Sequence, residues 1–234
     1  MRQSSVIKSL SSDIDAALEK ENLSKGSRGY LGASAIGDEC LRKIQYQYRD
    51  PAPHFEGRIL RIFERGHVGE ESAVEWLRKI GFVIKNETES GKQIGFISGQ
   101  GKYRGHCDGI ILETPYSEIK TPAILEVKFL GSKGWKKVAA DGVAVVYPTY
   151  YAQISQYQAY MSAENPALFM AVNADTQEIY FELVKFNAKL AQSTTDKAVQ
   201  ILKAEEVGEL LPRAYPSADF FKCKWCSYSE KCWS

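Results

Sequence analysis

The sequence is short of several features whose abundance would mark a particular class of protein. Its five cysteines are too few, and odd in number, for the disulfide framework of a secreted protein. No apolar run is long enough to span a bilayer, and the N-terminal twenty residues lack the uninterrupted apolar core of a signal peptide. We therefore expect a chain that stays outside the membrane, in a reducing cytoplasm.

The sequence also lacks an excess of charge of either sign. Thirty Lys and Arg residues face 29 Asp and Glu residues, a formal net charge of +1, so any affinity for a polyanion must come from local clustering. A hydrophobic content of 44% over 234 residues can fill a core and excludes disorder. No linker or internal repeat divides the chain, which predicts a single domain over 1–234.

Apolar periodicity predicts an α/β domain. From residue 82 onward the period is that of strands, and this region predicts in outline an antiparallel meander, then another strand pair after residue 166. The segment YRGHCDGIILE reads as one of these strands. The predicted helices cover residues 4–20, 41–49, 58–80, 150–163 and 187–210.

Two carboxylates and a lysine fall in the strand region. Asp108 lies in a β-branched run, and Glu126 and Lys128 lie two apart in LEVKFL, so their side chains point to the same side of a sheet. A hairpin would bring Asp108 beside Glu126. Such charges are costly to bury unless a hard divalent cation such as Mg²⁺ compensates them. Alternatively, they are ordinary alternating charges on a half-solvated strand.

Residues on two predicted helices add weight to the metal-site interpretation. Glu70 lies within the apolar face of 58–80, where a carboxylate needs a partner or a metal. His67 flanks this face, either as a boundary histidine or as a ligand. Gln153 and Tyr157, one turn apart, could engage a phosphate or a water. The apolar face itself is predicted to comprise Ile59, Phe63, Val74 and Leu77.

A basic stretch follows the Glu-x-Lys strand. Lysines flank Trp135 in KFLGSKGWKKV, a combination that suits a phosphate backbone and an unstacked base. The same stretch would also fit an ordinary solvated loop. The candidate DNA-binding residues are Lys133, Trp135, Lys136 and Lys137.

Three cysteines cluster at the C-terminus. Cys223, Cys226 and Cys232 have the short spacing that lets thiolates converge on one metal centre, and Cys40 is the natural fourth ligand. Cys107 is expected to be a packed core thiol because it lies inside a strand. Four thiolates admit either Zn²⁺ or an iron-sulfur cluster.

The order of these motifs resembles that of RecB-type nucleases of the PD-(D/E)xK superfamily, especially the iron-sulfur exonucleases associated with CRISPR adaptation and the AddB-type nuclease domains. The resemblance covers most of the chain, from Cys40 to Cys232. It rests on Cys40, the G-x3-E of Gly66 to Glu70, Asp108 in GHCDGI, the E-V-K of Glu126 to Lys128, the Q-x3-Y of Gln153 to Tyr157, and the C-x2-C-x5-C tail.

The resemblance implies a restriction-endonuclease-like core, with a central mixed sheet flanked by helices. It also implies that the N- and C-terminal segments, 1–57 and 211–234, form an iron-sulfur lobe around a catalytic core of 58–210. In this family the upstream cysteine and the tail ligate a [4Fe-4S] cluster. The implied ligands are Cys40, Cys223, Cys226 and Cys232.

The resemblance further implies that Asp108, Glu126, Glu70 and the Val127 carbonyl hold Mg²⁺ or Mn²⁺ for phosphodiester hydrolysis, while Lys128 places the attacking water. Gln153 and Tyr157 are implied members of the same catalytic set. RecB-type members usually have His four positions after the helix glycine. Glu70 stands there in this chain, as in the lambda-exonuclease-like branch, which leaves His67 as a second-choice ligand.

The implied function is metal-dependent DNA cleavage, with exonuclease action on single strands or DNA ends. The alternatives are a DNA-end-binding or processing subunit of a recombination or CRISPR-adaptation complex, and a zinc-stabilised nucleic-acid-binding module. Candidate protein partners are a helicase, a recombinase and CRISPR-adaptation proteins, because the chain has no phosphate-binding loop of the G-x4-G-K-[ST] type. The expected compartment is the cytoplasm of a prokaryotic or phage-infected cell, and no membrane partner is expected.

Overall fold

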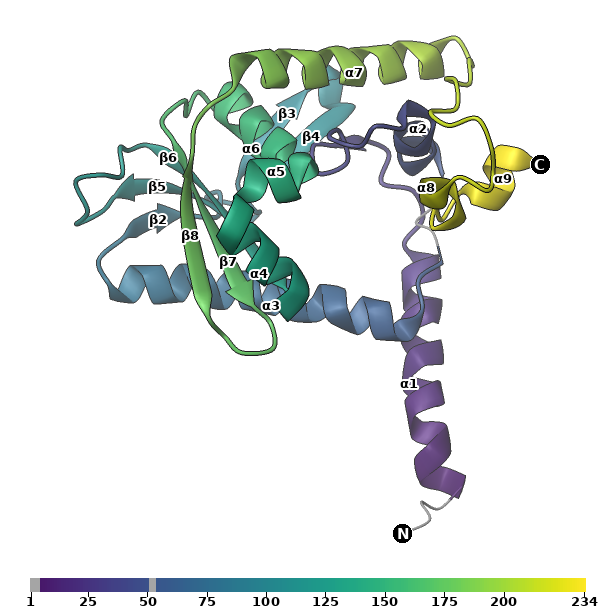
Figure 1. Ribbon diagram of the computed structural model, residues 1–234, viewed down its shortest axis with the longest axis horizontal. Coiled ribbons are helices and arrows are strands. Elements are labelled where there is room, and N and C mark those ends of the chain that lie inside the picture. Colours follow the sequence, from purple (N-terminus) through teal and green to yellow (C-terminus); the bar gives the residue numbers. More distant parts are fainter. Residues whose placement is uncertain (1–4, 51–53) are drawn as a thin grey trace.

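A mixed five-stranded sheet forms the centre of the molecule in the computed structural model, which describes residues 5–50 and 54–234. The strand order is β2-β5-β6-β7-β8 (Figure 1). All neighbours are antiparallel except β6 and β7, which are parallel. The strands are β2 (Val83–Lys85), β5 (Gly109–Glu113), β6 (Ala123–Leu130), β7 (Ala167–Asn173) and β8 (Ile179–Val184).

The parallel pair β6 and β7 joins the last strand of the expected meander to the first strand of the pair expected after residue 166. Parallel neighbours need a crossover connection, and here three helices supply it. These are α4 (Ser132–Asp141), α5 (Val143–Val146) and α6 (Pro148–Tyr160). The first of them occupies the stretch that was expected to be a basic loop.

A second, three-stranded sheet has the order β1-β4-β3. It consists of β1 (Leu31–Gly32), β3 (Gly95–Ser98) and β4 (Tyr103–His106), with the short 3-10 helix η1 (Gly99–Gly101) between the last two. The single strand expected over YRGHCDGIILE is thus divided between two sheets, because β4 pairs with β3 while β5 pairs with β6. Asp108 lies at this break, immediately before β5.

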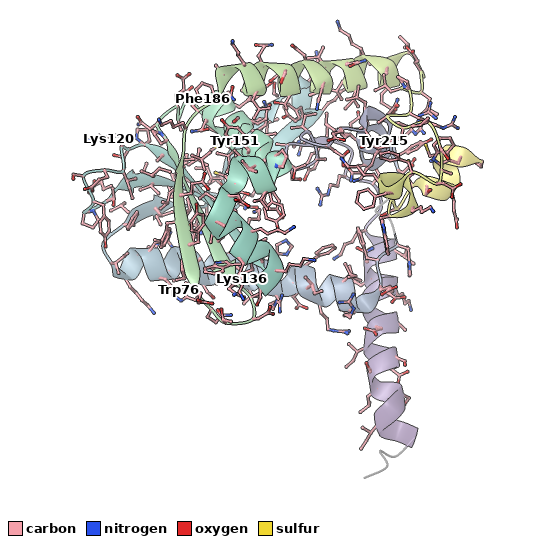
Figure 2. The ribbon with its side chains drawn as sticks, in the orientation of Figure 1. Trp76, Lys120, Lys136, Tyr151, Phe186 and Tyr215 are labelled. Atoms are coloured by element: carbon pink, nitrogen blue, oxygen red, sulfur yellow. The ribbon has the colours of Figure 1, made fainter. Side chains whose placement is uncertain are left out.

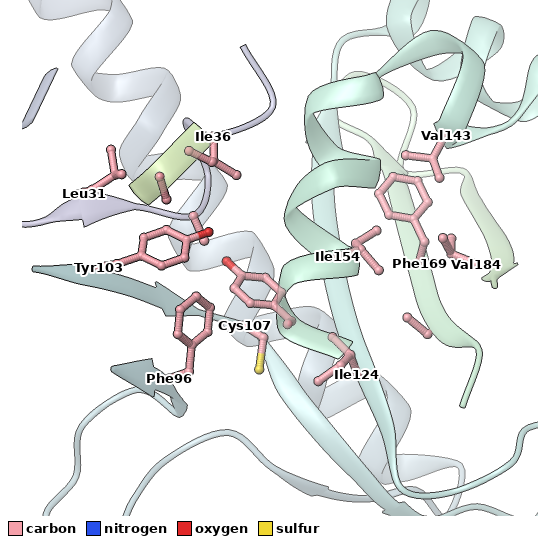
Figure 3. Close-up of a cluster of buried hydrophobic side chains, with 14 of the residues drawn as sticks. Leu31, Ile36, Phe96, Tyr103, Cys107, Ile124, Val143, Ile154, Phe169 and Val184 are labelled. Carbon is pink, nitrogen blue, oxygen red and sulfur yellow. The ribbon is translucent and has the colours of Figure 1, made fainter. Parts of the chain in front are cut away.

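Helices cover both faces of the larger sheet. The long helix α3 (Gly57–Lys79) packs across one face, where Val74 and Leu77 meet apolar residues of β5, β6 and β7. On the other face, α6 and α7 (Ala188–Glu206) enclose the larger core cluster shown in Figure 3. Cys107 is fully buried in that cluster, as expected of a core thiol.

The apolar face predicted for the 58–80 helix is only partly right. Val74 and Leu77 are buried, but Phe63 is exposed and packs edge-to-face on Phe55. The physical reason is that the first half of α3 runs past the sheet and meets α1 (Ser5–Ser24) instead (Figure 1).

The N- and C-terminal segments meet beside α7. Helix α2 (Leu41–Arg49) contacts α7, and the short helices α8 (Phe221–Lys224) and α9 (Ser229–Trp233) follow at the C-terminal end (Figure 1). Ion pairs join the two segments, from Lys222 to Glu39 and from Lys231 to Asp50. No helix among the described residues has the length and apolar content needed to cross a membrane.

Candidate active site and cysteine cavity

The β5–β6 pairing brings the two predicted carboxylates together. Gly109 lies opposite Leu125, so the next pair in this register is Asp108 and Glu126. An Asp108 carboxylate oxygen accepts a 2.7 Å hydrogen bond from the Val127 amide. Glu126 is buried, with 1% of its surface exposed.

Beyond Leu125 no pairing between β5 and β6 is found, whereas β6 stays paired with β7 as far as Leu130. Residues 126–130 of β6 thus have one side open to other elements. Glu70 of α3 and Tyr150 of α6 both approach this part of β6, because each is within reach of the Lys128 ammonium.

Lys128 lies at the centre of the group. Its Nζ is 2.6 Å from Glu126 Oε1 and 3.8 Å from Glu70 Oε1, and it donates a 2.8 Å hydrogen bond to the Val127 carbonyl. The ammonium also lies 5.5 Å from the centroid of the Tyr150 ring. We name Glu70, Asp108, Glu126 and Lys128 the acid-lysine cluster.

Negative charge exceeds positive charge in the acid-lysine cluster. Burial raises the pKa of Glu126 to about 8 and that of Glu70 to about 7, and Asp108 adds repulsion to both. Burial also raises the pKa of Asp108 above its usual range. Although burial alone would lower the pKa of Lys128, the three carboxylates outweigh it and raise this pKa, so the lysine is a stable cation.

The atoms of this cluster that could bind a metal are of the type that a hard divalent cation prefers. They are carboxylate oxygens, and Glu126 Oε2 is buried with no hydrogen-bond partner in the described structure. No three His, Cys, Asp or Glu side chains within 5–50 and 54–234 are arranged as a metal-ion site. At the acid-lysine cluster, the Lys128 ammonium lies 2.6 Å from Glu126 Oε1 and compensates part of the negative charge.

A cavity of about 320 Å³ opens in front of the acid-lysine cluster. Glu70 and Asp108 line it, and His67, the second-choice ligand, lies on the same wall. Apart from Val74, which was expected on the apolar face of α3, the remaining lining residues belong to no motif in the sequence. They are Glu71, Val74, Asn86, Glu87 and Gln93.

Gln153 and Tyr157 lie side by side, but their polar groups are engaged within the protein. Gln153 donates a 2.6 Å hydrogen bond to the Tyr157 hydroxyl, which donates in turn to the His106 carbonyl, also at 2.6 Å. Both side chains are buried. Tyr150, one turn earlier on α6, is the member of this face that contacts the lysine, and its spacing from Gln153 could have identified it.

The candidate DNA-binding residues lie on α4 rather than on a loop. Lys133, Lys136 and Lys137 are exposed, and Figure 2 shows Lys136 on the outside of this helix. Trp135 is placed differently, because its indole N–H donates a 2.9 Å hydrogen bond to the Ala171 carbonyl and its ring packs on the core. The tryptophan face is therefore used in packing.

The four cysteines of the predicted cluster line a single cavity of about 360 Å³. Cys40 immediately precedes α2, and the other three lie on or next to α8 and α9. Lys43 and Arg213 line the same cavity. The cysteines are free thiols, and soft thiolate donors of this kind suit zinc or iron-sulfur chemistry.

Contacts around this cavity tie its two sides together. The Tyr215 hydroxyl, labelled in Figure 2, donates to Glu39 beside Cys40, while within the tail Arg213 donates to the Cys232 carbonyl. The rings of Tyr46 and Tyr228 pack against each other at a tilt of 35°, with centroids 5.5 Å apart. The segments that carry Cys40 and the tail cysteines are therefore held together by the protein itself.

No protein-family model and no curated protein sequence matches the chain. Among solved structures, the chain is similar to an alkaline exonuclease, LHK-Exo, from Laribacter hongkongensis, with a TM-score of 0.55 and 12% identity over 82% of this chain and 93% of that chain. The same enzyme in complex with dAMP gives a TM-score of 0.56 and 12% identity, over 84% and 93%.

This likeness shows the fold of the chain. The chain has a mixed α/β architecture, with mixed sheets flanked by helices, similar to that of an exonuclease of known structure.

Proposed function

We propose that this protein is a metal-dependent DNA nuclease that acts on single strands or DNA ends, most simply as an exonuclease. The observation that carries the proposal is the acid-lysine cluster, with three carboxylates around one ammonium at the open side of β6. The similarity in fold to an alkaline exonuclease supports it. The exposed lysines of α4 supply local positive charge for a phosphate backbone.

Glu70, Asp108, Glu126 and the Val127 carbonyl are the groups that would hold Mg²⁺ or Mn²⁺. When bound, such an ion stabilises charge that develops on the phosphate and generates a nucleophile from water. Lys128 holds Oε1 of Glu126, whereas Oε2 has no hydrogen-bond partner among the described residues and is the oxygen that would face the ion. Lys128 stays protonated, so its role is to donate a hydrogen bond to a water or phosphate oxygen and to orient it.

The test is cleavage of end-labelled single- and double-stranded DNA with Mg²⁺ or Mn²⁺. We expect Glu126→Gln and Lys128→Met to lose about 100-fold or more in rate. Glu113→Gln, which alters an exposed carboxylate on the same sheet, is the matched control and should keep full activity. Full cleavage by both cluster variants would overturn the proposal, and DNA binding without any cleavage by the native protein would favour an end-binding subunit.

We further propose that Cys40, Cys223, Cys226 and Cys232 hold a [4Fe-4S] cluster that links the segments 1–57 and 211–234. The support for this proposal is that the four thiols line one cavity and that the order of the motifs resembles that of the iron-sulfur nucleases. The similar solved structures support the fold, and the identity of the metal centre is tested by experiment.

Purification without oxygen, followed by visible absorbance and iron, sulfide and zinc analysis, tests this second proposal. We expect a brown protein whose absorbance bleaches on reduction and is lost in Cys226→Ser. Cys107→Ala is the control, because this thiol lies in the core and does not line the cavity. Stoichiometric zinc without iron would identify a zinc-stabilised module instead.

A further inference from the structure

The outer edge of the larger sheet is formed by β8, which pairs only with β7 among the described strands. In Figure 1 this strand lies at the end of the sheet nearest the viewer. Three apolar side chains alternate along it and are exposed, Ile179 at 44%, Phe181 at 46% and Leu183 at 40%. An unprotected apolar edge of this kind is a template for pairing with another strand.

The main chain of these three residues also faces outward. Asn173 and Glu178 form a hydrogen-bonded pair at the start of the β7–β8 ladder, with the Asn173 amide 2.8 Å from the Glu178 carbonyl. Hydrogen-bonded and non-bonded pairs alternate along an antiparallel ladder. The N–H and C=O groups of Ile179, Phe181 and Leu183 therefore point away from β7, toward the free edge.

The apolar side chains extend a surface that α3 leaves uncovered. Phe181 lies opposite Met170 and Leu183 opposite Leu168, so they continue the sheet face that packs under α3. Between β8 and the end of α3 is a cavity of about 470 Å³, whose walls are mostly apolar. Its lining includes Leu77, Ile80, Tyr116, Phe181 and Leu183.

From this edge we infer that the protein pairs with a second copy of itself, β8 against β8 in antiparallel orientation, about a two-fold axis that passes beside Phe181. In that register Phe181 lies opposite Phe181 of the partner subunit. Ile179 lies opposite the partner's Leu183. Each is a pair of outward-facing residues, so each can exchange two main-chain hydrogen bonds.

The charged residues of β8 select this register over its neighbours. On the opposite sheet face, pairing about Phe181 places Tyr180 opposite the partner's Glu182, a combination that already forms a 3.3 Å hydrogen bond within the chain. Pairing about Tyr180 would place Glu182 opposite the partner's Glu178. Pairing about Glu182 would place that carboxylate opposite its own copy. Like charges directly opposite one another are destabilising, so of these three registers the one about Phe181 is favoured.

The inferred dimer is independent of the proposed nuclease activity. It would join two five-stranded sheets into one continuous sheet by an isologous contact, which closes after two copies. The acid-lysine cluster lies on the side of β6 away from β7 and β8, so it would stay open in both subunits.

Sedimentation or light scattering of the full chain over a concentration series tests the dimer. We expect the native protein to show twice the mass of one chain, and Phe181→Lys to weaken association by about tenfold or more, because two lysines would face each other across the axis. Ile97→Lys is the matched control. It alters an exposed apolar residue, on the edge strand β3 of the other sheet, and should leave the dimer intact.

Folding of Phe181→Lys is checked by its melting temperature and circular dichroism. A monomeric native protein at every concentration would overturn the inference, as would a dimer that Phe181→Lys leaves unchanged or a mass that grows beyond two copies.

Single cysteine substitutions test the register itself. Residues opposite each other in a hydrogen-bonded pair have Cα atoms about 5.5 Å apart, within the range that a disulfide spans. Phe181→Cys should therefore cross-link to its own copy on oxidation, well above the level of the native chain with its free cysteines. Ile179→Cys should cross-link only when mixed with Leu183→Cys, and equal self-linking by Ile179→Cys would contradict this register.

Discussion

At the scale of single residues, Glu126 is a buried carboxylate whose charge is only partly compensated. It is buried beside Asp108, and its Oε2 has no hydrogen-bond partner in the part of the chain described. Burial raises the pKa of this carboxyl to about 8, and the repulsion of Asp108 adds to the effect, while the Lys128 ammonium offsets only part of it. A bound cation would compensate this negative charge. The free energy of unfolding should therefore depend on metal binding and on pH.

The metal-free protein should lose stability as pH rises from about 5 to about 8. Glu126 and Glu70 titrate at about 8 and about 7 in the folded chain, well above their usual range. The folded state therefore binds more protons than the unfolded state in this window, and the free energy of unfolding falls with pH, by up to about 1.4 kcal/mol per pH unit for one such group. Urea unfolding of protein treated with a chelator measures the slope.

Glu126→Gln is the control for this pH dependence, because the amide does not titrate. Its slope should be smaller than that of the native protein, and added Mn²⁺ should raise the melting temperature of the native protein more than that of the variant. Identical slopes in the two proteins would show that this carboxyl is not the source.

Tyr157 is expected to position the site rather than to contact substrate. Its hydroxyl is shared between Gln153 and the His106 carbonyl, two residues before Asp108. Tyr157→Phe leaves both partners unsatisfied and should cost about 1–3 kcal/mol of stability. Cleavage should fall by less than about tenfold, against about 100-fold for Lys128→Met. Tyr116→Phe, on an exposed ring, is the control, and a loss in Tyr157→Phe as large as that of Lys128→Met would restore a direct catalytic role.

At the scale of elements, the approach of α3 to β6 depends on a glycine. A Cβ placed on Gly69 would lie 2.6 Å from the Phe129 ring, whereas one placed on Gly66 meets nothing within 4 Å. Gly69 precedes Glu70, so the close packing here also sets the distance between that carboxylate and Lys128. The glycine of the G-x3-E motif is thus not the one that the packing requires.

Gly69→Ala should accordingly be less stable than Gly66→Ala by about 1–3 kcal/mol, since both gain helix propensity but only the first overfills the contact. Cleavage should fall in Gly69→Ala because Glu70 is displaced, and should be unchanged in Gly66→Ala. Chemical unfolding and the cleavage assay, run on the pair, provide the measurement. Equal stability and activity in the two variants would contradict this account of the helix–sheet contact.

The elements also show where a sequence is sufficient. Strand period alone places Glu126 and Lys128 on one side of a sheet, and the structure confirms that placement through their 2.6 Å ion pair. The break at Cys107 could not be foreseen, because alternation continues through it and only pairing with two different sheets ends one strand there. Helix α4 was missed because its glycine and lysines resemble a loop, while Trp135 packs on the core.

At the scale of the whole molecule, the N- and C-terminal segments meet at a buried amide. Gln45 of α2 is fully buried, and its Nε2 donates to the Glu205 carboxylate and the Glu209 carbonyl. Its Oε1 accepts from the Leu211 amide at 2.9 Å. One side chain therefore fixes the point where the chain leaves α7 and turns toward the cysteine cavity.

This amide also explains how the cavity can be formed from both ends of the chain. A segment as short as the tail, with helices of one turn, has little core of its own and depends on what anchors it. Gln45 anchors its beginning, and the ion pairs of Lys222 and Lys231 anchor the rest at the surface. Because exposed ion pairs contribute little, the buried amide should dominate.

Gln45→Ala should therefore loosen the tail and leave the catalytic core folded. The Leu211 amide and the Glu209 carbonyl would lose their partner, at a cost of about 2–4 kcal/mol for the docked tail. Limited trypsin digestion with mass spectrometry should show faster cleavage at Arg213 and Lys222. Gln47→Ala, on the same helix, is the matched control, since Gln47 Oε1 has no hydrogen-bond partner among the described residues. Equal digestion of the two variants would mean that the thiols and their ligand, rather than the protein contacts, hold the two ends together.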